Sequence, residues 1–501
     1  MKQGYIPKDQ RKTILFLADD MRLPSGIGTM TKELILGSAH HYNFFQVGAA
    51  ISHPEAGRLV DVSADVNKHA GIDDAYVRIL PFNGYGTPDL IRQILNQEKI
   101  SAIVHFTDPR YWDWLYSMSA ELRQHVPLFY YHIWDDLPAP HYNRPFYESC
   151  DLLMGISKQS VNISRLVLGK DRYVELSSNT SPEDIKKTYP KVCYVPHGIN
   201  HNHFYPIDPN QEELKQFKAK LFGDRTPKFT ILYNNRNIRR KMASDIVLGF
   251  KLFLDRVAQE GSPKDTKDIL LVMHTQPIDE NGTDLYAVIN ALCPQYRENI
   301  LFTNSRYDVF DMNRLYNSTD VTINVGSNEG WGLSSTEALM AGRVIINNVT
   351  GGLQDQMRFE DEKGNWIEFN EKFATNHLGK YKTHGIWAKP VYPASINLQG
   401  SIPTPYIFDD RADVRDIAKA MMYWYVAGPD ERKDCGAAGR EWVMSAEAKM
   451  TAEAMCNNFI DSCDRVLDNW VAPKKFQLYN CKQEIQDFKY KPTGIELSYD
   501  E

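Results

Sequence analysis

The sequence predicts an α/β protein built from two doubly wound domains in tandem. Short apolar runs rich in β-branched and aromatic residues alternate with amphipathic helical stretches along most of the 501 residues, which is the pattern of parallel sheets covered by helices. A stretch rich in Pro, Asn and His, VPHGINHNHFYPIDPNQEE, interrupts the alternation, which then restarts. A chain of this length exceeds one ordinary hydrophobic core. We therefore expect domains over residues 1–205 and 206–455, followed by a C-terminal helix and tail, 456–501, that returns to the first domain.

Apolar runs define the strands expected in each domain. In the first domain these runs cover residues 13–18, 43–49, 101–106, 127–133 and 151–156. In the second domain they cover residues 229–235, 269–275, 300–305, 321–326 and 344–349. Residues from about 355 to 410 show weak periodicity with several Pro and Gly, and we interpret them as an insertion of loops. From DVRDIAKAMMYWYV to about residue 470 the pattern is helical again.

Composition and charge narrow the class of protein. The formal net charge of −7 gives no global electrostatic attraction to nucleic acids or anionic membranes. The seven cysteines are scattered without CxxC spacing, which fits reduced thiols and disfavours a metal site of the Cys/His type. The first apolar run, ILFLA, is far too short for a signal sequence or a membrane span. We therefore expect an intracellular, cytoplasmic protein.

The stretch SNEGWGLSSTEALMAG, residues 327–342, places two carboxylates around a glycine-rich turn. Glu329 lies in the turn, and Glu337 lies in the first turn of a predicted helix. Ser334, three residues before Glu337, fits a capping box, which is a purely structural role. The GWG segment instead leaves backbone amides near a helix N-terminus, which suits an anion, and both carboxylates could accept hydrogen bonds from sugar hydroxyls. The residues alone leave both interpretations of Glu337 open.

The longer stretch GSNEGWGLSSTEALMAGRVII resembles the signature of the family 4 retaining glycosyltransferases, which have the GT-B fold. Other segments resemble the same family in order along the chain: ISKQS, VPHGINHNHFYP, NNRNIRRKMASDIVLGF and GAAGREWV. The resemblance covers most of residues 13–465. It implies two Rossmann-like domains that face a central cleft, and a retaining transfer of a hexosyl or pentosyl group from a nucleotide-sugar, with UDP as the expected nucleotide. It implies no cofactor beyond this co-substrate. The sequence contains no Asp-x-Asp metal motif, so we expect a metal-independent enzyme.

The resemblance also assigns roles around the glycine-rich turn. Glu329 would bind hydroxyls of the donor sugar, and Glu337 would bind the nucleotide ribose. The intervening residues that would complete the donor-binding turn are Gly330, Trp331, Gly332 and Leu333.

A basic segment, RNIRRK, follows the first strand of the second domain. By the resemblance, Arg236 and Lys241 would neutralise the departing diphosphate, a role that needs cations aimed at growing negative charge. The structural alternative is a solvated basic turn. We expect Arg239 and Arg240 to be solvated.

Two features of the first domain fit the same function. LPSGIGTMTKEL places Gly26 and Gly28 between the first strand and a helix. The family has a glycine loop here that faces the cleft and can contact phosphate or acceptor, although a lone GxG is often only a turn. His132 falls where the family often has a cleft histidine near the donor sugar, and a histidine at a strand end can equally be structural. We expect His105 to be core packing.

A second resemblance concerns the acceptor. Residues 106–147 contain twelve aromatic residues in 42, about 29% against 12% for the whole chain, which could include a stacking surface for a sugar or a base. This segment and FLADDMRLPSGIGT resemble glycosyltransferases encoded by large tailed bacteriophages, some of which add sugars to hydroxymethylated cytosine in DNA. Hydroxymethylated DNA is therefore one expected partner.

Binding to DNA would need cations along the phosphate backbone. The local candidates are Arg110, Arg123, Arg144 and the lysines of the tail, at 474, 475, 482, 489 and 491. The alternative acceptor is a glycan or lipid-linked sugar of a cell surface. An alternative of another class is a non-catalytic protein that binds sugar nucleotides.

Overall fold

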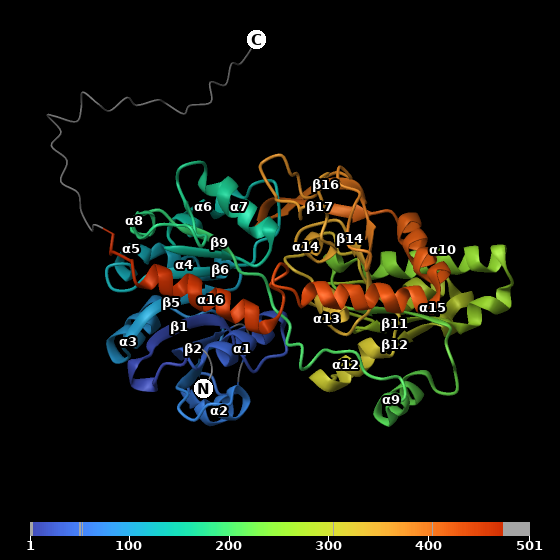
Figure 1. Ribbon diagram of the computed structural model, residues 1–501, viewed down its shortest axis with the longest axis horizontal. Helices are drawn as coiled ribbons and strands as arrows, with labels where there is room; N and C mark the ends of the chain where they lie inside the picture. Colours follow the sequence, from blue (N-terminus) through green and yellow to red (C-terminus); the bar gives the residue numbers. More distant parts are fainter. Residues whose placement is uncertain (1–3, 50–51, 53, 304, 403, 474–501) are drawn as a thin grey trace, which may run out of the picture.

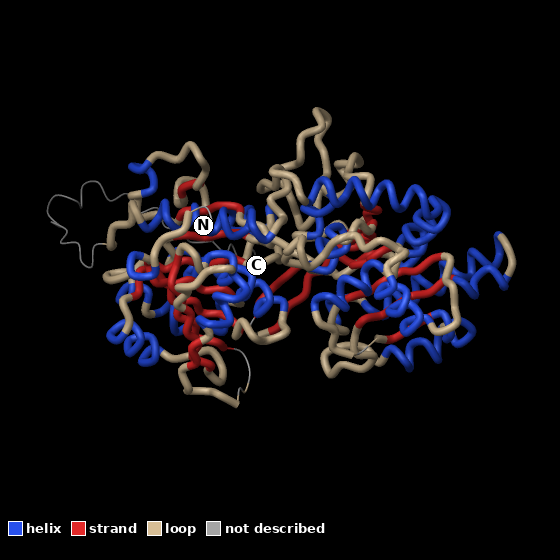
Figure 2. Tube along the Cα trace, turned by 60° about the horizontal axis from the view of Figure 1, so that its bottom comes forward, coloured by secondary structure: helices blue, strands red, loops and turns tan. Residues whose placement is uncertain are grey.

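The chain forms two lobes that lie side by side along the longest axis of the molecule (Figure 1). The computed structural model describes residues 4–473 except residues 50, 51, 53, 304 and 403. Each lobe contains its own sheet with helices packed around it, as the tube in Figure 2 also shows. The lysine-rich tail, which the sequence analysis considered for DNA binding, lies outside the described residues.

The first lobe holds a nine-stranded sheet that is parallel except at one edge, where β3 runs antiparallel to β4. In sheet order the strands are β3 (Val60–Asp61), β4 (Val77–Pro81), β2 (Tyr42–Ala49), β1 (Lys12–Asp19), β5 (Ile100–Phe106), β6 (Leu128–His132), β7 (Leu152–Gly155), β9 (Lys191–Tyr194) and β8 (Val174–Glu175). The α-helices of this part of the chain are α1 (Gly26–Ser38), α2 (Ser63–Ala70), α3 (Pro88–Gln97), α4 (Asp113–Ser117), α5 (Ser119–Leu122), α6 (Arg144–Glu148), α7 (Lys158–Leu168) and α8 (Pro182–Ile185).

The second lobe holds a six-stranded parallel sheet. In sheet order its strands are β12 (Ile300–Phe302), β11 (Ile269–His274), β10 (Phe229–Asn234), β13 (Val321–Asn324), β14 (Val344–Asn348) and β15 (Ala388–Val391). Its α-helices are α9 (Glu212–Phe222), α10 (Ala243–Glu260), α11 (Leu285–Leu292), α12 (Val309–Asn317), α13 (Leu333–Met340), α14 (Leu353–Met357) and α15 (Val414–Val443). The last of these is interrupted at Gly428, whose φ of 82° is not helical and which precedes Pro429.

The prediction of loops over residues 355–410 is wrong for the second half of that segment. β15 extends the sheet beside β14, and β16 (Pro393–Ser401) pairs with β17 (Thr404–Ala412) in an antiparallel hairpin. The hairpin reaches the first lobe, where the amide of Phe408 donates to the carbonyl of Leu137 at 2.6 Å. The insertion therefore connects the lobes.

Both faces of the parallel sheet in each lobe are buried. In β1, Ile14 and Phe16 belong to one core cluster, while Leu15 and Leu17 belong to another on the opposite face. This explains why the strand is a continuous apolar run without alternation, as is usual for parallel sheets covered by helices.

The chain crosses between the lobes twice, and the two crossings bond each other. The amide of Ile199 donates to the carbonyl of Met450 at 2.9 Å, and the amide of Ala452 donates back to the carbonyl of Ile199 at 3.0 Å. Glycine is required beside this contact, because a Cβ on Gly198 would lie 2.2 Å from the carbonyl oxygen of Thr451.

After the second crossing, α16 (Ala452–Leu467) packs on the first lobe (Figure 1). The ring of Phe459 lies 6.4 Å from that of Phe16. Asp464 accepts a hydrogen bond from the Tyr42 hydroxyl at 2.8 Å. The C-terminal helix thus completes the core of the N-terminal lobe.

In the described part of the chain, no helix combines the length and the apolar character needed to cross a membrane. The cysteines placed there are buried, and none of them forms a disulfide.

Candidate functional site

The candidate site lies at the carboxyl ends of two adjacent parallel strands of the second sheet, β10 and β13. The turn after β10 carries Arg236 and Lys241, and the turn after β13 carries Glu329. Neighbouring parallel strands end at the same edge of a sheet, so the two turns meet although they are far apart in sequence. This edge is where ligands bind in open α/β sheets.

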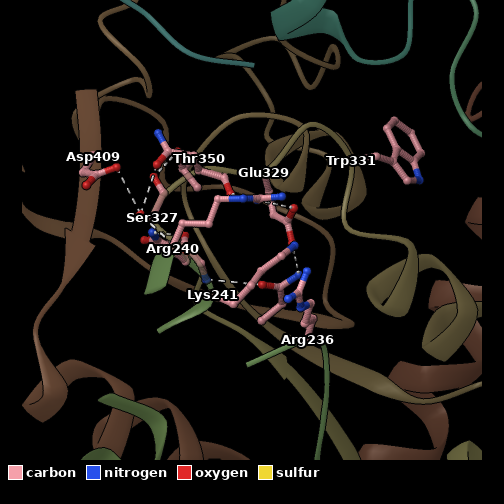
Figure 3. A network of polar contacts seen from close by, with 12 residues as sticks. Arg236, Arg240, Lys241, Ser327, Glu329, Trp331, Thr350 and Asp409 are labelled. Carbon is pink, nitrogen blue, oxygen red and sulfur yellow. Dashed lines mark hydrogen bonds and ion pairs between the residues drawn. The ribbon is translucent and has the colours of Figure 1, made fainter. Parts of the chain in front are cut away.

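Glu329 is the centre of this site (Figure 3). Its Oε1 atom forms an ion pair with Lys241 Nζ and accepts a hydrogen bond from Asn324 Nδ2 at 3.1 Å. Its Oε2 atom lies 3.3 Å from Arg240 Nη1. The side chains of Lys241 and Glu329 are only 11% and 5% exposed. A buried carboxylate is stable only with such partners.

Burial disfavours the charged form of both Glu329 and Lys241, but the net effect on the two pKa values differs. Burial raises the pKa of Glu329, yet the positive charges of Lys241 and Arg240 outweigh it and lower that pKa to about 2. Burial lowers the pKa of Lys241 to about 8, and the charge of Glu329 offsets this only in part. Both groups are therefore predominantly ionised at neutral pH.

Arg240 belongs to the site, although the sequence predicted it to be solvated. Its side chain is 44% exposed, but its guanidinium donates to the carbonyl of Asn328 at 2.8 Å and pairs with Glu329. Arg239 is exposed, as expected. Met242, the next residue after Lys241, has a φ of 52°. This left-handed conformation is uncommon for a residue with a side chain, and such conformations cluster at functional sites.

Arg236 does not pair with Glu329. It is 60% exposed and bonds Asp279, with Nε to Oδ2 at 2.7 Å and Nη2 to Oδ1 at 3.1 Å. Asp279 follows β11, the strand beside β10. Arg236 therefore lies at the rim of the site, oriented by an acidic residue that the sequence analysis did not identify.

Glu337 lies in a partly buried hydrogen-bonded chain, and the predicted capping box is absent. α13 begins at Leu333 with Gly332 as its N-cap, and no side chain caps it. Instead, the Tyr316 hydroxyl donates to Glu337 Oε2 at 2.6 Å and accepts from Asn234 Nδ2 at 2.8 Å. Burial raises the pKa of Glu337 to about 7, against a smaller lowering by the Tyr316 hydrogen bond.

The glycine-rich turn packs tightly in the second lobe and touches the first. Gly332 has a φ of 85°, and a Cβ there would lie 2.4 Å from Leu353 Cδ2, so only glycine fits. A Cβ on Gly330 would lie 3.2 Å from the carbonyl oxygen of Ile133 in the first lobe. Trp331 is buried, and its indole donates to Thr336 Oγ1 at 3.0 Å. Its ring stands apart from the charged residues in Figure 3, which indicates a packing role.

The glycine loop of the first lobe meets this turn at one of its two glycines. A Cβ on Gly26 would lie 3.5 Å from Leu333 Cδ1, so this position faces the second lobe. Gly28 instead faces its own loop, where a Cβ would lie 2.5 Å from the carbonyl oxygen of Leu23. The amide of Gly28 donates to Ser25 Oγ at 2.9 Å, and this hydrogen bond caps the N-terminus of α1.

His132 is buried inside the first lobe and has neither ring nitrogen available to a ligand. Its Nε2 lies 2.8 Å from the Tyr147 hydroxyl, and its Nδ1 lies 3.0 Å from Ser164 Oγ. Burial lowers the pKa of His132 to about 3. The structure therefore gives His132 the structural role that was the alternative to a cleft histidine. His105 is likewise buried, as expected for core packing.

The polar partners that orient these residues were not predicted from the sequence. Asn324 ends β13, the strand VTIN, five residues before Glu329, and a polar residue at a strand end is a signal that could have identified it. Tyr316 and Asp279 come from segments that carry no motif. Among the residues that the structure describes, no group of three or more His, Cys, Asp or Glu side chains is arranged to hold a metal ion.

No protein-family model matches the chain, and no curated protein matches it. Among solved structures, the chain is similar to a glycosyltransferase from Rickettsia africae ESF-5, with 13% identity, a TM-score of 0.59 and coverage of 92% of this chain and 100% of that chain. It is similar to Anabaena Alr3699/HepE in complex with UDP and glucose, with 11% identity, a TM-score of 0.58 and coverage of 91% and 100%. It is also similar to sucrose-phosphate synthase (tll1590) from Thermosynechococcus elongatus, with 15% identity, a TM-score of 0.59 and coverage of 91% and 100%.

Identities this low show the fold alone. The neighbours have the GT-B fold, so the predicted fold class is confirmed. Membership of family 4 and the link to bacteriophages stay predictions.

Proposed function

We propose that this chain is a retaining, metal-independent glycosyltransferase that moves a sugar from a UDP-sugar to a hydroxyl acceptor. The observation that carries the proposal is the buried pair of Lys241 and Glu329, with Arg240 and Arg236 beside it, at the ligand-binding edge of a GT-B sheet. UDP is the favoured nucleotide because Anabaena HepE, which covers most of this chain, was solved with UDP and glucose.

The cations of the site match the charge that grows in such a reaction. When the bond from the anomeric carbon to the diphosphate breaks, the electron pair stays on the diphosphate. Lys241 and Arg240 would stabilise the negative charge that develops there. Glu329 fixes both cations in place beforehand, so little reorganisation is needed. Because its pKa is about 2, Glu329 remains an anion that can also accept a hydrogen bond from a sugar hydroxyl.

Glu337 is the proposed ribose ligand. Tyr316 already bonds Oε2 at 2.6 Å, and we assign Oε1 to the ribose hydroxyls. A carboxylate accepts two such hydrogen bonds well, but a protonated carboxyl does not.

The described surface favours a neutral hydroxyl acceptor, such as a glycan, over DNA. Each arginine considered for DNA binding is engaged within the protein: Arg110 pairs with Asp108, Arg123 with Asp151, and Arg144 donates to the carbonyls of Val167 and Leu168. Hydroxymethylated DNA stays an acceptor suggested by the phage resemblance and by the aromatic density of residues 106–147.

The test is release of UDP from a panel of UDP-sugars, measured alone, with a glycan library, and with DNA containing either cytosine or hydroxymethylcytosine. Wild-type protein is expected to bind UDP and to release it from at least one UDP-sugar, and Lys241→Ala is expected to bind UDP more weakly and to lose turnover. If wild-type protein binds UDP-sugars without consuming any of them in the presence of acceptors, the non-catalytic alternative replaces this proposal. Label appearing only in hydroxymethylated DNA would establish the DNA acceptor instead of a glycan.

A further inference from the structure

A carboxylate of the first lobe lies against the donor turn of the second. Asp135 follows β6 in the segment Ile133–Asp136, and its Oδ2 would be 3.9 Å from a Cβ placed on Gly330. Gly330 is the residue next to Glu329. Asp135 therefore lies where the first lobe faces the sugar-binding part of the proposed site.

Packing from both lobes fixes the position of this segment. Trp134 is buried, with the Arg110 guanidinium 4.6 Å from its ring centroid, and its indole donates to the carbonyl of Asp136 at 3.1 Å. On the other side, Phe408 of the β16–β17 hairpin donates its amide to Leu137 and accepts from Asn328 Nδ2 at 2.5 Å. One residue of the hairpin thus bonds both Leu137, which directly follows the Asp135 segment, and the turn that carries Glu329.

The charges around Asp135 come from both lobes. Arg240, Lys241 and Glu329 face it from the second lobe, and Asp136 adjoins it in its own segment. Arg240 is directed at Glu329 and Asn328, and Lys241 is directed at Glu329. In the described part of the chain, no cationic side chain forms an ion pair with Asp135.

Burial raises the pKa of Asp135 to about 6, against the lowering effect of Arg240. At pH values above that pKa the group is an anion. An anion near a bound diphosphate is unfavourable unless it receives a hydrogen bond from another donor. The donors that a nucleotide-sugar brings to this place are the hydroxyls of its sugar.

We propose that Asp135 is a specificity residue that accepts a hydrogen bond from a hydroxyl of the donor sugar, opposite Glu329. The site then holds the sugar between two carboxylates from different lobes, so it selects a neutral, hydroxylated sugar and rejects a uronic acid, whose own carboxylate both would repel. This inference rests on the proposed function and adds the class of the transferred sugar.

The experiment compares Asp135→Asn with wild type in calorimetric titrations with UDP, UDP-glucose, UDP-galactose and UDP-glucuronate. Asp135→Asn should weaken the best-bound neutral UDP-sugar by about tenfold or more, the scale of a lost hydrogen bond to a charged group. It should leave the affinity for UDP unchanged or make it tighter, because a repelling charge near the diphosphate is removed. Wild type should bind UDP-glucuronate more weakly than the neutral sugars.

The matched control is Asp113→Asn, the same change at an exposed position of the first lobe, which should alter none of these affinities. An equal loss of UDP and UDP-sugar affinity in Asp135→Asn would indicate a merely structural role and overturn the inference, as would unchanged binding of all ligands or tight binding of UDP-glucuronate by wild type. Wild-type protein that binds no UDP at all would overturn the proposed function itself. The two failures are thus distinct.

Discussion

Lys241 and Glu329 form a buried ion pair that joins the carboxyl ends of two neighbouring strands, β10 and β13. Removing one partner of such a pair leaves the other as an uncompensated buried charge. The same two charges are those assigned to the diphosphate and the donor sugar. Stability and chemistry therefore depend on the same contact.

Replacing Glu329 with Gln is expected to destabilise the protein at neutral pH and to flatten its response to acid. The folded-state pKa of Glu329 is about 2, below its ordinary 4.5, so its stabilising contribution is present above pH 4.5 and is lost as the pH falls toward 2. A lowering of the pKa by that amount corresponds to about 3 kcal/mol of the free energy of unfolding. Melting temperatures measured from pH 7 to pH 3 should show the gap between wild type and Glu329→Gln shrinking below pH 4.5. A gap that stays constant would mean that Glu329 is not held by Lys241 and Arg240.

Replacing Arg236 with Ala is expected to lower turnover by roughly 10²-fold, the scale of one lost transition-state donor, with little change in melting temperature. Arg236 is 60% exposed, so water solvates the cation of its ion pair with Asp279, whose side chain is 9% exposed, and such a pair contributes less to stability than a fully buried one. Asp279→Asn is the matched control: it removes the same ion pair but keeps the cation, so turnover should stay near that of wild type. Equal losses in both variants would show that the pair, and not the cation, matters.

Replacing Glu337 with Gln is expected to weaken UDP binding and yet stabilise the protein at pH 8. The pKa of Glu337 is raised to about 7, above its ordinary 4.5, so stability falls as the pH rises from 4.5 through 7. Glutamine does not ionise, so the substitution removes this loss of stability at high pH. Thermal melting at pH 5 and pH 8 should show a gain only at the higher pH, while calorimetry with UDP shows weaker binding. A variant that melts lower at both values would instead show that Glu337 has a structural role through its hydrogen bond with Tyr316.

Replacing His132 with Ala is expected to lower stability without changing turnover per folded molecule by more than about twofold. The imidazole is enclosed between Tyr147 and Ser164, and removing it leaves a cavity and unbonded hydroxyls, a loss of roughly 2–5 kcal/mol. The fraction folded is measured by circular dichroism, and turnover is measured well below the melting temperature. A fully folded variant without activity would return His132 to the list of catalytic residues.

Sequence patterns predicted the central strands because burial on both faces makes them continuous apolar runs. Every strand predicted from such a run is present. Seven of the strands in the described part of the chain were not predicted: β3, β4, β8, β9, β15, β16 and β17. Two of these omissions have a clear physical reason. β15 contains Pro390 and lies at the sheet edge, where proline is tolerated. β16 projects from the sheet with most of its side chains exposed, so it has no apolar face to detect.

Glu329 and Lys241 could be predicted as site residues because each lies in a motif that follows a strand. The hydrogen-bond partners of the site could not, because Tyr316 and Asp279 reach it only through the strand order of the folded sheet. The roles of Arg239 and Arg240 differ because the turn before Met242 directs one guanidinium toward Glu329 and leaves the other in solvent. That choice is made by backbone conformation, which a run of basic residues does not reveal.

The paired crossings between the lobes have a mechanical consequence. Ile199 and Thr451 lie in parallel segments joined by backbone hydrogen bonds. A rotation of one lobe against the other would therefore have to bend both segments together at this bridge. It would also have to break the hydrogen bond of Phe408 with Leu137, which joins the hairpin to the first lobe.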